Sequence, residues 1–529
     1  LAFWSERIFS KKEILQMYFN EVPYGGPAWG IEAAAQTYFG KEASQLTLAE
    51  AAYLAGLPAS PTTYSPYGTN PDLGKQRQKD VLRRMREDGY ISKQEEQEAV
   101  KEELAIKPPT QQIKAPHFVM YVRSQLSKKY GEKTVSQGGL KIMTTLDLSL
   151  QKMAEDIVAE EVKKISHLNV SNGAAMITNA KTGEILAMVG SKNFWDPNGG
   201  NFNVTTAQRQ PGSSIKPITY ATGFKQGLSP GSVVVDAPIA YRNEWEVYAP
   251  VNYDGRFHGP VTVRTALGSS YNVPAVKILS MVGIPNMIDT AHDLGITTLK
   301  DKNRYGLSLT LGGGEIKLLD MMTVYGTFSQ LGEKHDATAV LKITDSNGVI
   351  LEENTDFEGK RVISEGIAYM IADILSDNKA RTPAFGPNSQ LVIPNKTVAA
   401  KTGTTDSKRD NWTFGFTPEF VVGVWVGNNN NAPMDPQLTS GVTGASPIWQ
   451  KIMLTLLKDR PNLAFQRPAE VVIGSVSGQK DLVLVNSNTN AVFAQEKALE
   501  KPKKEDNPIT FTDPLKPIRI DQKKPATIP

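Results

Sequence analysis

The stretch RQPGSSIKPITY, residues 209–220, places Ser213 three residues before Lys216. The Pro-Gly pair before the serine predicts a sharp helix start, and Pro217 fits a first helical turn because N–H groups there have no partner. The serine hydroxyl would then lie near free N–H groups and the positive end of the helix dipole, with the lysine one turn above it. The stretch indicates either a nucleophilic serine with a lysine base or an ordinary turn into a helix.

The Ser-x-x-Lys spacing by itself carries little information, because it occurs four times in the chain. Only the pair at 213 and 216 follows Pro-Gly, which makes it the candidate. The other pairs are Ser149 with Lys152, Ser376 with Lys379, and Ser477 with Lys480.

A lysine accepts a serine proton only when it is neutral, and burial and a second nearby cation both lower its pKa. The tripeptide Lys-Thr-Gly supplies a second lysine twice, at residues 181–183 and 401–403. The first copy lies in a predicted hairpin turn. The second, in AAKTGTT, lies on a predicted strand and offers a substrate carboxylate a charge, two hydroxyls and a glycine that admits close approach. The residues of this second copy and its neighbour are Lys401, Thr402, Gly403 and Thr404.

A third polar element, Ser-x-Asn, occurs at residues 191–193, 270–272 and 376–378. Ser270 and Asn272 stand at the start of an apolar helical stretch, LGSSYNVPAVKIL, between the candidate nucleophile and the second Lys-Thr-Gly. The copy at 191–193 precedes the nucleophile. The copy at 376–378, in LSDNKAR, also follows it, and it remains an alternative.

Composition excludes several kinds of chemistry. The chain has 529 residues, enough for two or three domains, and its net charge of +3 gives no reason to expect a nucleic-acid partner. It has no cysteine, which excludes thiolate catalysis, disulfides and cysteine-zinc sites. The five histidines are scattered, so neither a metal site nor a Ser-His-Asp triad is expected.

The distribution of residue types predicts several regions. Residues 1–106 are rich in helical patterns, and Thr47 with Glu50 form a capping-box signature. The stretch KPPTQQIKAP, residues 107–116, reads as a linker. Apolar runs at 172–190 predict a hairpin, helices follow, and strands return with TVAAKTGTT and EFVVGVWVGN. Strands at both ends with helices between them predict one antiparallel sheet completed by distant segments.

No apolar run approaches the roughly 20 residues needed to span a bilayer. The first residue is Leu1 and the sequence after it already has a helical pattern. We therefore expect the chain to be a piece of a longer protein.

The three motifs, in the order Ser213-x-x-Lys216, Ser270-x-Asn272 and Lys401-Thr402-Gly403, resemble the active-site set of penicillin-binding proteins and serine β-lactamases. NAKTGEILAMVGS, SSYNVPAVKIL, AAKTGTTDSKRDNW and SPIWQKIM further resemble the transpeptidase domain of class A penicillin-binding proteins. The N-terminal ERIFSKKEILQMYFNEVPYGGPAWGIEAAAQTYFGK resembles the last two motifs of that family's peptidoglycan glycosyltransferase domain. The resemblance extends from the first residue to about residue 460.

The resemblance implies a multi-domain fold. Residues 1–106 would be the C-terminal part of an all-α, lysozyme-like glycosyltransferase domain, and 107–168 a linker and pedestal. Residues 169–460 would form an α+β transpeptidase domain, with a central antiparallel sheet flanked by helices. Residues 461–529 would comprise a small β segment and a disordered Lys/Pro-rich tail. The family's glycosyltransferase glutamates lie in earlier motifs, so this chain alone is not expected to polymerise glycan.

The resemblance also implies roles for the motif residues. Ser213 would attack the carbonyl between the last two D-alanines of a peptidoglycan stem peptide, Lys216 would accept its proton, and Ser270 would relay a proton to the departing D-alanine. The N–H groups of Ser213 and Thr404 would form the oxyanion hole. Asn272 would hold the substrate amide.

The terminal carboxylate would be held by the second Lys-Thr-Gly region: Lys401, Thr402, Gly403 and Thr404. The acyl group would pass to an amine of a neighbouring stem peptide, and β-lactams would acylate the same serine. The transpeptidase domain would need no cofactor and no metal. One departure is KRDNWTFGF, where the family usually has Asp-Ala-Trp-Phe and this chain has Asn411 and Thr413.

The implied setting is the extracytoplasmic face of a bacterial cell membrane, with a lipid-linked disaccharide-peptide as substrate of the intact parent and cell-wall synthesis proteins as possible partners. Two alternatives use the same motifs: a D,D-carboxypeptidase, and a β-lactam-binding scaffold or sensor without turnover. A class A β-lactamase is disfavoured, because no glutamate between Asn272 and Lys401 is followed four residues later by asparagine.

Overall fold

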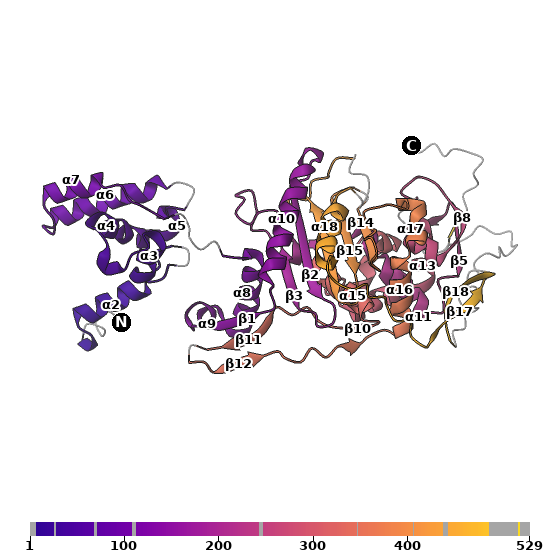
Figure 1. Ribbon diagram of the computed structural model, residues 1–529. Coiled ribbons are helices and arrows are strands. Elements are labelled where there is room, and N and C mark those ends of the chain that lie inside the picture. The colour runs from indigo at the N-terminus through magenta and orange to yellow at the C-terminus, as the bar shows by residue number, and fades with distance from the viewer. Residues whose placement is uncertain are drawn as a thin grey trace. The chain divides into compact units, whose positions relative to one another are not determined.

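The computed structural model describes residues 7–25, 28–67, 71–107, 113–242, 247–345, 347–405, 407–436, 443–485 and 517–518 (Figure 1). The chain divides into two compact units, Leu1–Lys114 and Ala115–Pro529. The predicted boundaries at 106, 168 and 460 stay predictions. Most of the predicted disordered tail, and the linker residues 108–112, lie outside the described residues. None of the helices in the described part of the chain has the length and apolar character that crossing a bilayer requires.

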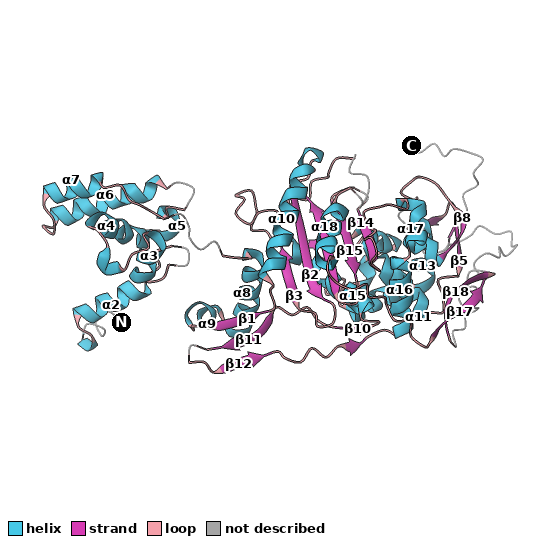
Figure 2. Cartoon of the chain, in the orientation of Figure 1, coloured by secondary structure: helices cyan, strands magenta, loops and turns pink. Residues whose placement is uncertain are grey.

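The N-terminal unit is helical (Figure 2). The predicted capping box is confirmed, because the Thr47 side chain accepts from the Glu50 N–H while the Glu50 carboxylate accepts from the Thr47 N–H. Buried aromatic side chains, among them Tyr38 and Tyr53, form its small core. Its helices are α2 (Lys11–Glu21), α3 (Ile31–Tyr38), α4 (Leu48–Gly56), α5 (Pro61–Tyr64), α6 (Asp72–Glu87) and α7 (Lys93–Lys101).

The second unit begins with helices that lead into its sheet. These are α8 (Pro116–Tyr130), α9 (Glu132–Gln137) and, after strand β1 (Lys141–Thr144), α10 (Leu148–Lys164). Strand β1 pairs antiparallel with β11 (Val340–Thr344), which pairs with β12 (Ile350–Glu353).

The central sheet has five antiparallel strands in the order β14-β15-β16-β2-β3. Its closure depends on β2 and β16, whose ends pair as Asn172 with Gly427 and as Asn179 with Phe420. Figure 1 shows this as magenta strands lying beside orange ones. The prediction of one sheet completed by distant segments is confirmed. Its strands are β2 (Asn172–Asn179), β3 (Ile185–Val189), β14 (Ala399–Thr404), β15 (Asp410–Phe416) and β16 (Phe420–Gly427).

Helices cover both faces of this sheet, so it is buried on each side (Figure 2). Alternate residues of a strand point to opposite faces. On β16, Val422 and Val424 therefore pack in the cluster with α10, whereas Val421 and Trp425 pack in a larger cluster on the opposite face. The larger cluster is the core on which the candidate site is built.

The remaining helices of the second unit are α11 (Lys216–Lys225), α12 (Val263–Gly268), α13 (Asn272–Val282), α14 (Ile284–Leu294), α15 (Leu318–Ser329), α16 (Glu365–Ser376), α17 (Asn378–Phe385) and α18 (Ala445–Leu457). A C-terminal hairpin, β17 (Val471–Val476) with β18 (Gln479–Leu484), follows. Short strands form the remaining pairs: β4 (Gln208–Arg209), β5 (Val233–Asp236), β6 (Ala240–Arg242), β7 (Val247–Tyr248), β8 (Gly259–Thr262), β9 (Ile316–Lys317), β10 (Glu333–Lys334), β13 (Lys360–Arg361) and β19 (Pro517–Ile518).

Candidate active site

The candidate nucleophile lies on a short 3₁₀ turn and not inside an α-helix. The turn η5 (Gly212–Ile215) is followed by α11, which begins at Lys216. The sequence predicts Ser213 within a helical first turn. The structure tightens that turn, because Pro217 has no N–H to donate to the Ser213 carbonyl. The Lys216 N–H donates to that carbonyl instead, so the serine stands directly before the helix.

Backbone segments meet at this turn with no side chains between them. A Cβ on Gly403 would lie 2.2 Å from the Pro211 carbonyl oxygen, and one on Gly212 would lie 2.5 Å from the carbonyl oxygen of Thr404. Gly312 approaches from another segment, where a Cβ would lie 2.3 Å from the N atom of Gly212. The glycine of the second Lys-Thr-Gly, predicted to admit substrate, therefore also admits the nucleophile turn against the edge strand β14.

Two aromatic side chains fix the same turn, and no motif in the sequence assigns either of them to the site. The Trp412 indole N–H donates to the Gln210 carbonyl oxygen at 2.8 Å, and the Tyr325 hydroxyl donates to the Ser214 carbonyl oxygen at 2.8 Å. The Ser214 hydroxyl donates to the Pro211 carbonyl oxygen at 2.7 Å. Because these donors come from β15 and α15, the turn is fixed by the core behind it.

Ser270 joins the two lysine amines. Its Oγ accepts from Lys401 Nζ at 2.7 Å and lies 3.5 Å from Lys216 Nζ. Its backbone is in the left-handed region, with φ 59°, a conformation that strains a residue other than glycine and is found at functional sites. The two amines, predicted from motifs 185 residues apart (401 − 216), therefore meet at one hydroxyl.

Lys216 is buried completely and is held by the second motif. Its Nζ donates to the carbonyl oxygens of Ser270 at 2.6 Å and Tyr271 at 3.1 Å, and to Asn272 Oδ1 at 2.7 Å. These acceptors come from the loop that leads into α13 and from its first residue. The lysine that follows the nucleophile therefore also fixes the Ser-x-Asn segment beside it.

Burial and a second cation make the Lys401 amine a weak base. The side chain is 2 % exposed, and burial, with the charge of Arg381 as a smaller cause, lowers the pKa of Lys401 to about 7. Burial also lowers the pKa of Arg381, to about 10. The sequence places Arg381 in LSDNKAR, the segment of the competing Ser-x-Asn copy, and no spacing rule marks it as a site residue.

Asn252, another residue that the sequence did not single out, caps the N-terminus of α13, the helix that begins at Asn272 of the Ser-x-Asn motif. Its Oδ1 accepts from the N–H groups of Asn272 at 2.8 Å and Val273 at 3.2 Å. Its Nδ2 donates to the buried carboxylate of Asp236 at 2.7 Å. Helix α13 has no side-chain cap from its own N-cap residue, Tyr271, so an asparagine from a distant loop supplies that bond.

These residues surround a cavity of about 130 Å³. Five of the predicted site residues line it directly. Ala384, Phe385 and Leu311 supply an apolar wall, and Tyr253 and Asp254 also line it. The five predicted residues are Ser213, Ser270, Asn272, Thr402 and Thr404.

The register of β14 directs the Thr404 N–H toward this cavity. The Thr405 N–H donates to the Asp410 carbonyl, and Thr404 pairs with Asn411 in the ladder. Hydrogen-bonded and non-hydrogen-bonded residues alternate along an antiparallel pair, so the Thr404 N–H points away from β15. Since β14 is at the sheet edge, that direction is the side on which Gly212 packs.

The other motif copies lie apart from the cavity lining. Ser376 donates to the Asp373 carbonyl at 3.1 Å, and Asn378 Nδ2 donates to the Pro387 carbonyl at 2.8 Å, so this copy ends one helix and begins the next. Lys152 is on α10, paired with Asp156. The structure brings Ser270 and Asn272, not Ser376 and Asn378, to the two lysines.

Larger cavities of about 400 Å³ and 410 Å³ lie elsewhere, lined mainly by asparagines near Asn172 and by the side of α8 that carries His117. Neither contains a residue of the motifs at 213–216, 270–272 or 401–403, although the Ser-x-Asn copy at 191–193 lines the first. Within the described residues, no three His, Asp or Glu side chains are grouped as a metal site.

Comparison with known proteins agrees with this geometry. The transglycosylase family matches residues 1–86, and the penicillin-binding protein transpeptidase domain matches residues 173–453. Penicillin-binding protein 2D of Bacillus subtilis is 34 % identical over 89 % of this chain and 68 % of its own length. Penicillin-binding protein 1A of Aquifex aeolicus is 31 % identical over 93 % and 77 %.

Solved structures share the fold. Penicillin-binding protein 1A from Haemophilus influenzae covers 90 % of this chain and 92 % of its own with a TM-score of 0.70 and 24 % identity. PonA1 from Mycobacterium tuberculosis covers 69 % and 97 % with a TM-score of 0.59 and 23 % identity. The helical first unit and the transpeptidase sheet predicted from the sequence are thereby confirmed. The chain belongs to the class A penicillin-binding proteins.

Proposed function

We propose that the second unit cross-links peptidoglycan stem peptides through an acyl-enzyme on Ser213. The observation that carries this proposal is the position of the Ser270 hydroxyl, 2.7 Å from the Lys401 amine and 3.5 Å from the Lys216 amine, in a cavity that Ser213 lines. A serine hydroxyl between two buried amines offers a short path for protons next to a nucleophile.

Acylation begins when Ser213 Oγ attacks the carbonyl carbon between the two terminal D-alanines. Its proton passes to the amine of Lys216, and the N–H groups of Ser213 and Thr404 stabilise the oxyanion of the tetrahedral intermediate. The carbon–nitrogen bond then breaks, and the proton passes through the Ser270 hydroxyl to the amine of the departing D-alanine. Each oxyanion donor contributes about 3–4 kcal/mol to the lowered barrier.

The donor's terminal carboxylate binds along the edge strand β14, at Lys401, Thr402 and Thr404, with Gly403 beneath it. Asn272 holds the donor's amide. An amine of a neighbouring stem peptide then attacks the ester, which forms the cross-link and restores the Ser213 hydroxyl. A β-lactam presents the same carboxylate and a reactive carbonyl, so it leaves an ester on Ser213.

We place this chemistry on the extracytoplasmic face of the bacterial membrane, where the intact parent also polymerises the lipid-linked disaccharide-peptide and contacts other cell-wall synthesis proteins. The transpeptidase reaction uses no cofactor or metal, since all of its proton transfers and charge stabilisation are assigned to side chains and N–H groups. Acylation should therefore proceed at the same rate with a metal chelator present.

The test is covalent labelling by a fluorescent penicillin. Ser213→Ala should abolish the label, because the acylated oxygen is removed. Ser376→Ala, a serine of the competing Ser-x-x-Lys copy, is the matched control and should label as the unmodified chain does. Persistent labelling of Ser213→Ala would remove this serine from the role of nucleophile.

A second measurement determines what the acyl group is transferred to. Stem peptides incubated with the chain and an acceptor amine should yield a cross-linked dimer and free D-alanine. If only the shortened peptide and D-alanine appear, water is the acceptor and the chain is a D,D-carboxypeptidase. If penicillin labels the chain but stem peptides are not turned over, it is a β-lactam-binding scaffold.

A further inference from the structure

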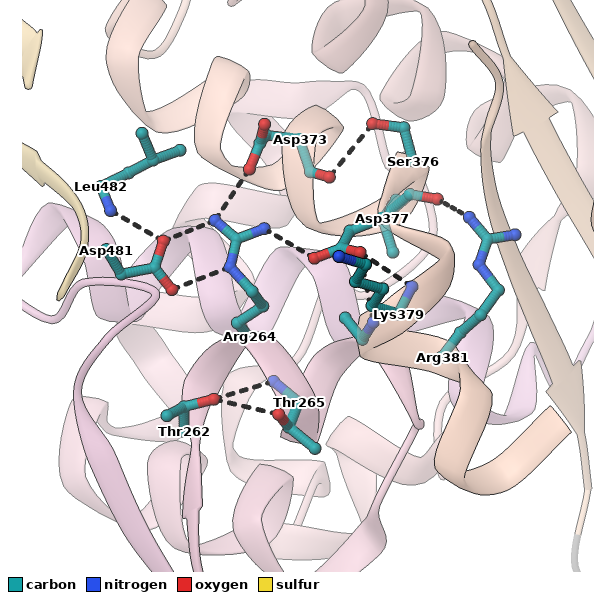
Figure 3. A network of polar contacts seen from close by, with 12 residues as sticks. Thr262, Arg264, Thr265, Asp373, Ser376, Asp377, Lys379, Arg381, Asp481 and Leu482 are labelled. Carbon is teal, nitrogen blue, oxygen red and sulfur yellow. Dashed lines mark hydrogen bonds and ion pairs between the residues drawn. The ribbon is translucent and has the colours of Figure 1, made fainter. Parts of the chain in front are cut away.

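A second polar network joins α12 and α16 to the C-terminal hairpin (Figure 3). Arg264, on α12, extends its guanidinium among the carboxylates of Asp481 on β18, Asp373 on α16, and Asp377, which lies between α16 and α17. Nε and Nη2 donate to the two oxygens of Asp481 on β18 at 2.8 and 2.6 Å. Nη2 also pairs with Asp373 on α16 at 2.8 Å, and Nη1 donates to Asp377 at 3.3 Å.

The bond to Asp481 is bidentate, which fixes both the position and the orientation of the guanidinium. The network is largely shielded from solvent, since the Arg264 side chain is 19 % exposed and that of Asp481 13 %. Although burial opposes its charge, hydrogen bonding to Asp481 and the charge of Asp373 raise the pKa of Arg264 further. The group is thus a permanent cation that joins the hairpin to the helices.

The backbone that follows Arg264 leads to the Ser270-x-Asn272 motif. Helix α12 ends at Gly268, and Ser269 and the strained Ser270 follow directly. The Ser269 hydroxyl donates to the Ala380 carbonyl at 2.8 Å, and a Cβ on Gly268 would lie 2.7 Å from the Ala380 Cβ. Helix α12 therefore packs directly against α17 just before the residue that joins the two lysine amines.

The guanidinium of Arg264 is connected through Asp377 to the apolar wall of the cavity. One oxygen of Asp377 meets the guanidinium, while the other accepts from the N–H groups of Lys379 and Ala380 and so begins α17. The last residues of α17 include Ala384 and Phe385, which line the cavity. Both the Ser-x-Asn loop and this wall are thus tied to one guanidinium.

The hairpin is attached to the core as well as to Arg264. Val471 and Leu482 are buried in the large hydrophobic cluster, and the Gly366 N–H donates to Glu470. The Asp481 carboxylate therefore has a fixed position from which to hold the arginine.

We propose that Arg264, clasped by Asp481 of the C-terminal hairpin, is a positioning residue that sets the Ser270–Asn272 loop and the Ala384–Phe385 wall at their spacing for acylation. The hairpin then belongs to the transpeptidase machinery and is not an appendage. The inference rests on the proposed function, because it assigns Ser270 to proton transfer and the wall to donor binding.

The test compares Asp481→Asn with Asp481→Glu in the full chain, using stopped-flow acylation by a fluorescent penicillin. Asparagine keeps the shape of the aspartate side chain but has no charge, and one of its two polar groups is an amide NH₂ that cannot accept from the guanidinium. The bidentate pair is therefore lost. Because a displacement of about 1 Å can cost about 100-fold in rate, we expect the acylation rate constant at saturating penicillin to fall about ten-fold. Glutamate keeps the carboxylate and should recover part of that loss.

The rate constant of the active fraction separates positioning from plain destabilisation, which lowers the amount of active protein instead. Lys451→Met is the matched control, because Lys451 on α18 likewise pairs with two carboxylates of another helix, Glu160 and Glu161 of α10, away from the cavity. Its melting temperature should fall, while its rate constant should not change.

An unchanged rate constant in Asp481→Asn would overturn the inference, as would an equal loss in Lys451→Met. If Asp481→Asn does not fold, Arg264→Lys, which keeps the charge and loses the bidentate pair, is judged by the same two criteria. Failure of the proposed function is distinguishable, because the unmodified chain would then not be labelled at Ser213 at all.

Discussion

The chain contains Lys-Thr-Gly in two regions of one sheet, and the two copies have opposite fates. At 181–183 the tripeptide forms the turn between β2 and β3, where Lys181 is exposed and Thr182 donates to Glu184 at 2.7 Å. At 401–403 it forms the edge strand β14, where Lys401 is buried and donates to Ser270. The same three residues form a turn in one setting and part of the candidate site in the other.

The difference lies in what the surrounding backbone does to each residue. Gly183 has φ 75° and closes a turn, whereas Gly403 is extended and allows the nucleophile turn to lie against the strand. A motif therefore indicates a site only when its neighbours bury the charge and bring a second motif to it. Three comparisons between the copies, and one change in the first copy alone, test this conclusion.

The largest contrast is expected between the two lysines. Lys401→Ala removes the buried amine that donates to Ser270 and that we propose binds the substrate carboxylate, so acylation by penicillin should slow by about 100-fold or more. Lys181→Ala removes an exposed side chain and should leave both acylation and melting temperature unchanged. Comparable losses in the two variants would contradict the assignment.

The glycines should separate activity from stability. Gly403→Ala places a Cβ 2.2 Å from the Pro211 carbonyl oxygen and should push the nucleophile turn away, with a loss of acylation of more than about ten-fold. Gly183→Ala places a Cβ 2.4 Å from the Asp336 carbonyl oxygen at a positive φ, so it should lower the melting temperature. Its folded fraction should still acylate normally. The check is the acylation rate of the active fraction beside thermal unfolding.

A smaller contrast is expected in the pH dependence of stability. Burial lowers the pKa of Lys401 to about 7 in the folded chain, whereas the unfolded chain has the ordinary value of 10.5. Between these values the unfolded chain binds more protons, so this group makes the free energy of unfolding rise with pH, by at most about 1.4 kcal/mol per pH unit.

Urea unfolding across this pH range should therefore show a shallower rise for Lys401→Met than for the unmodified chain. Lys181→Met, at the exposed copy, should run parallel to the unmodified chain. Parallel curves for all three proteins would mean that Lys401 keeps its ordinary proton affinity.

The smallest effect is expected at the threonine of the first copy. Thr182→Ala removes one hydrogen bond to Glu184 near the surface, which should lower the free energy of unfolding by about 0.5–1 kcal/mol. Acylation should not change. A measurable loss of acylation would show that the turn is coupled to the site, against the contrast drawn above.

Much of the site could be predicted because most of its candidate residues belong to short sequence motifs. Ser213, Lys216, Ser270, Asn272 and Lys401 were identifiable from residue types, order and context, and the structure gathers them around one cavity. The sheet was predictable too, since its strands are apolar runs bounded by turn residues.

The supporting residues could not be predicted. Trp412 and Tyr325 each hold the nucleophile turn by one hydrogen bond to a carbonyl oxygen. In a sequence, such a residue cannot be told from any other buried aromatic residue. Arg381 affects Lys401 by proximity in space, which no local pattern encodes. The left-handed backbone of Ser270 is imposed by its surroundings, since serine has no preference for that conformation.

The pairing of β2 with β16 affects how the chain folds during its synthesis. During synthesis, the hairpin of β2 and β3 emerges long before β14, β15 and β16, and until then it has no neighbour on the β2 side. Such long-range pairing makes folding slow. Newly made chains should therefore react with penicillin only after β14, β15 and β16 have joined the sheet. Penicillin labelling would then report which chains have finished folding.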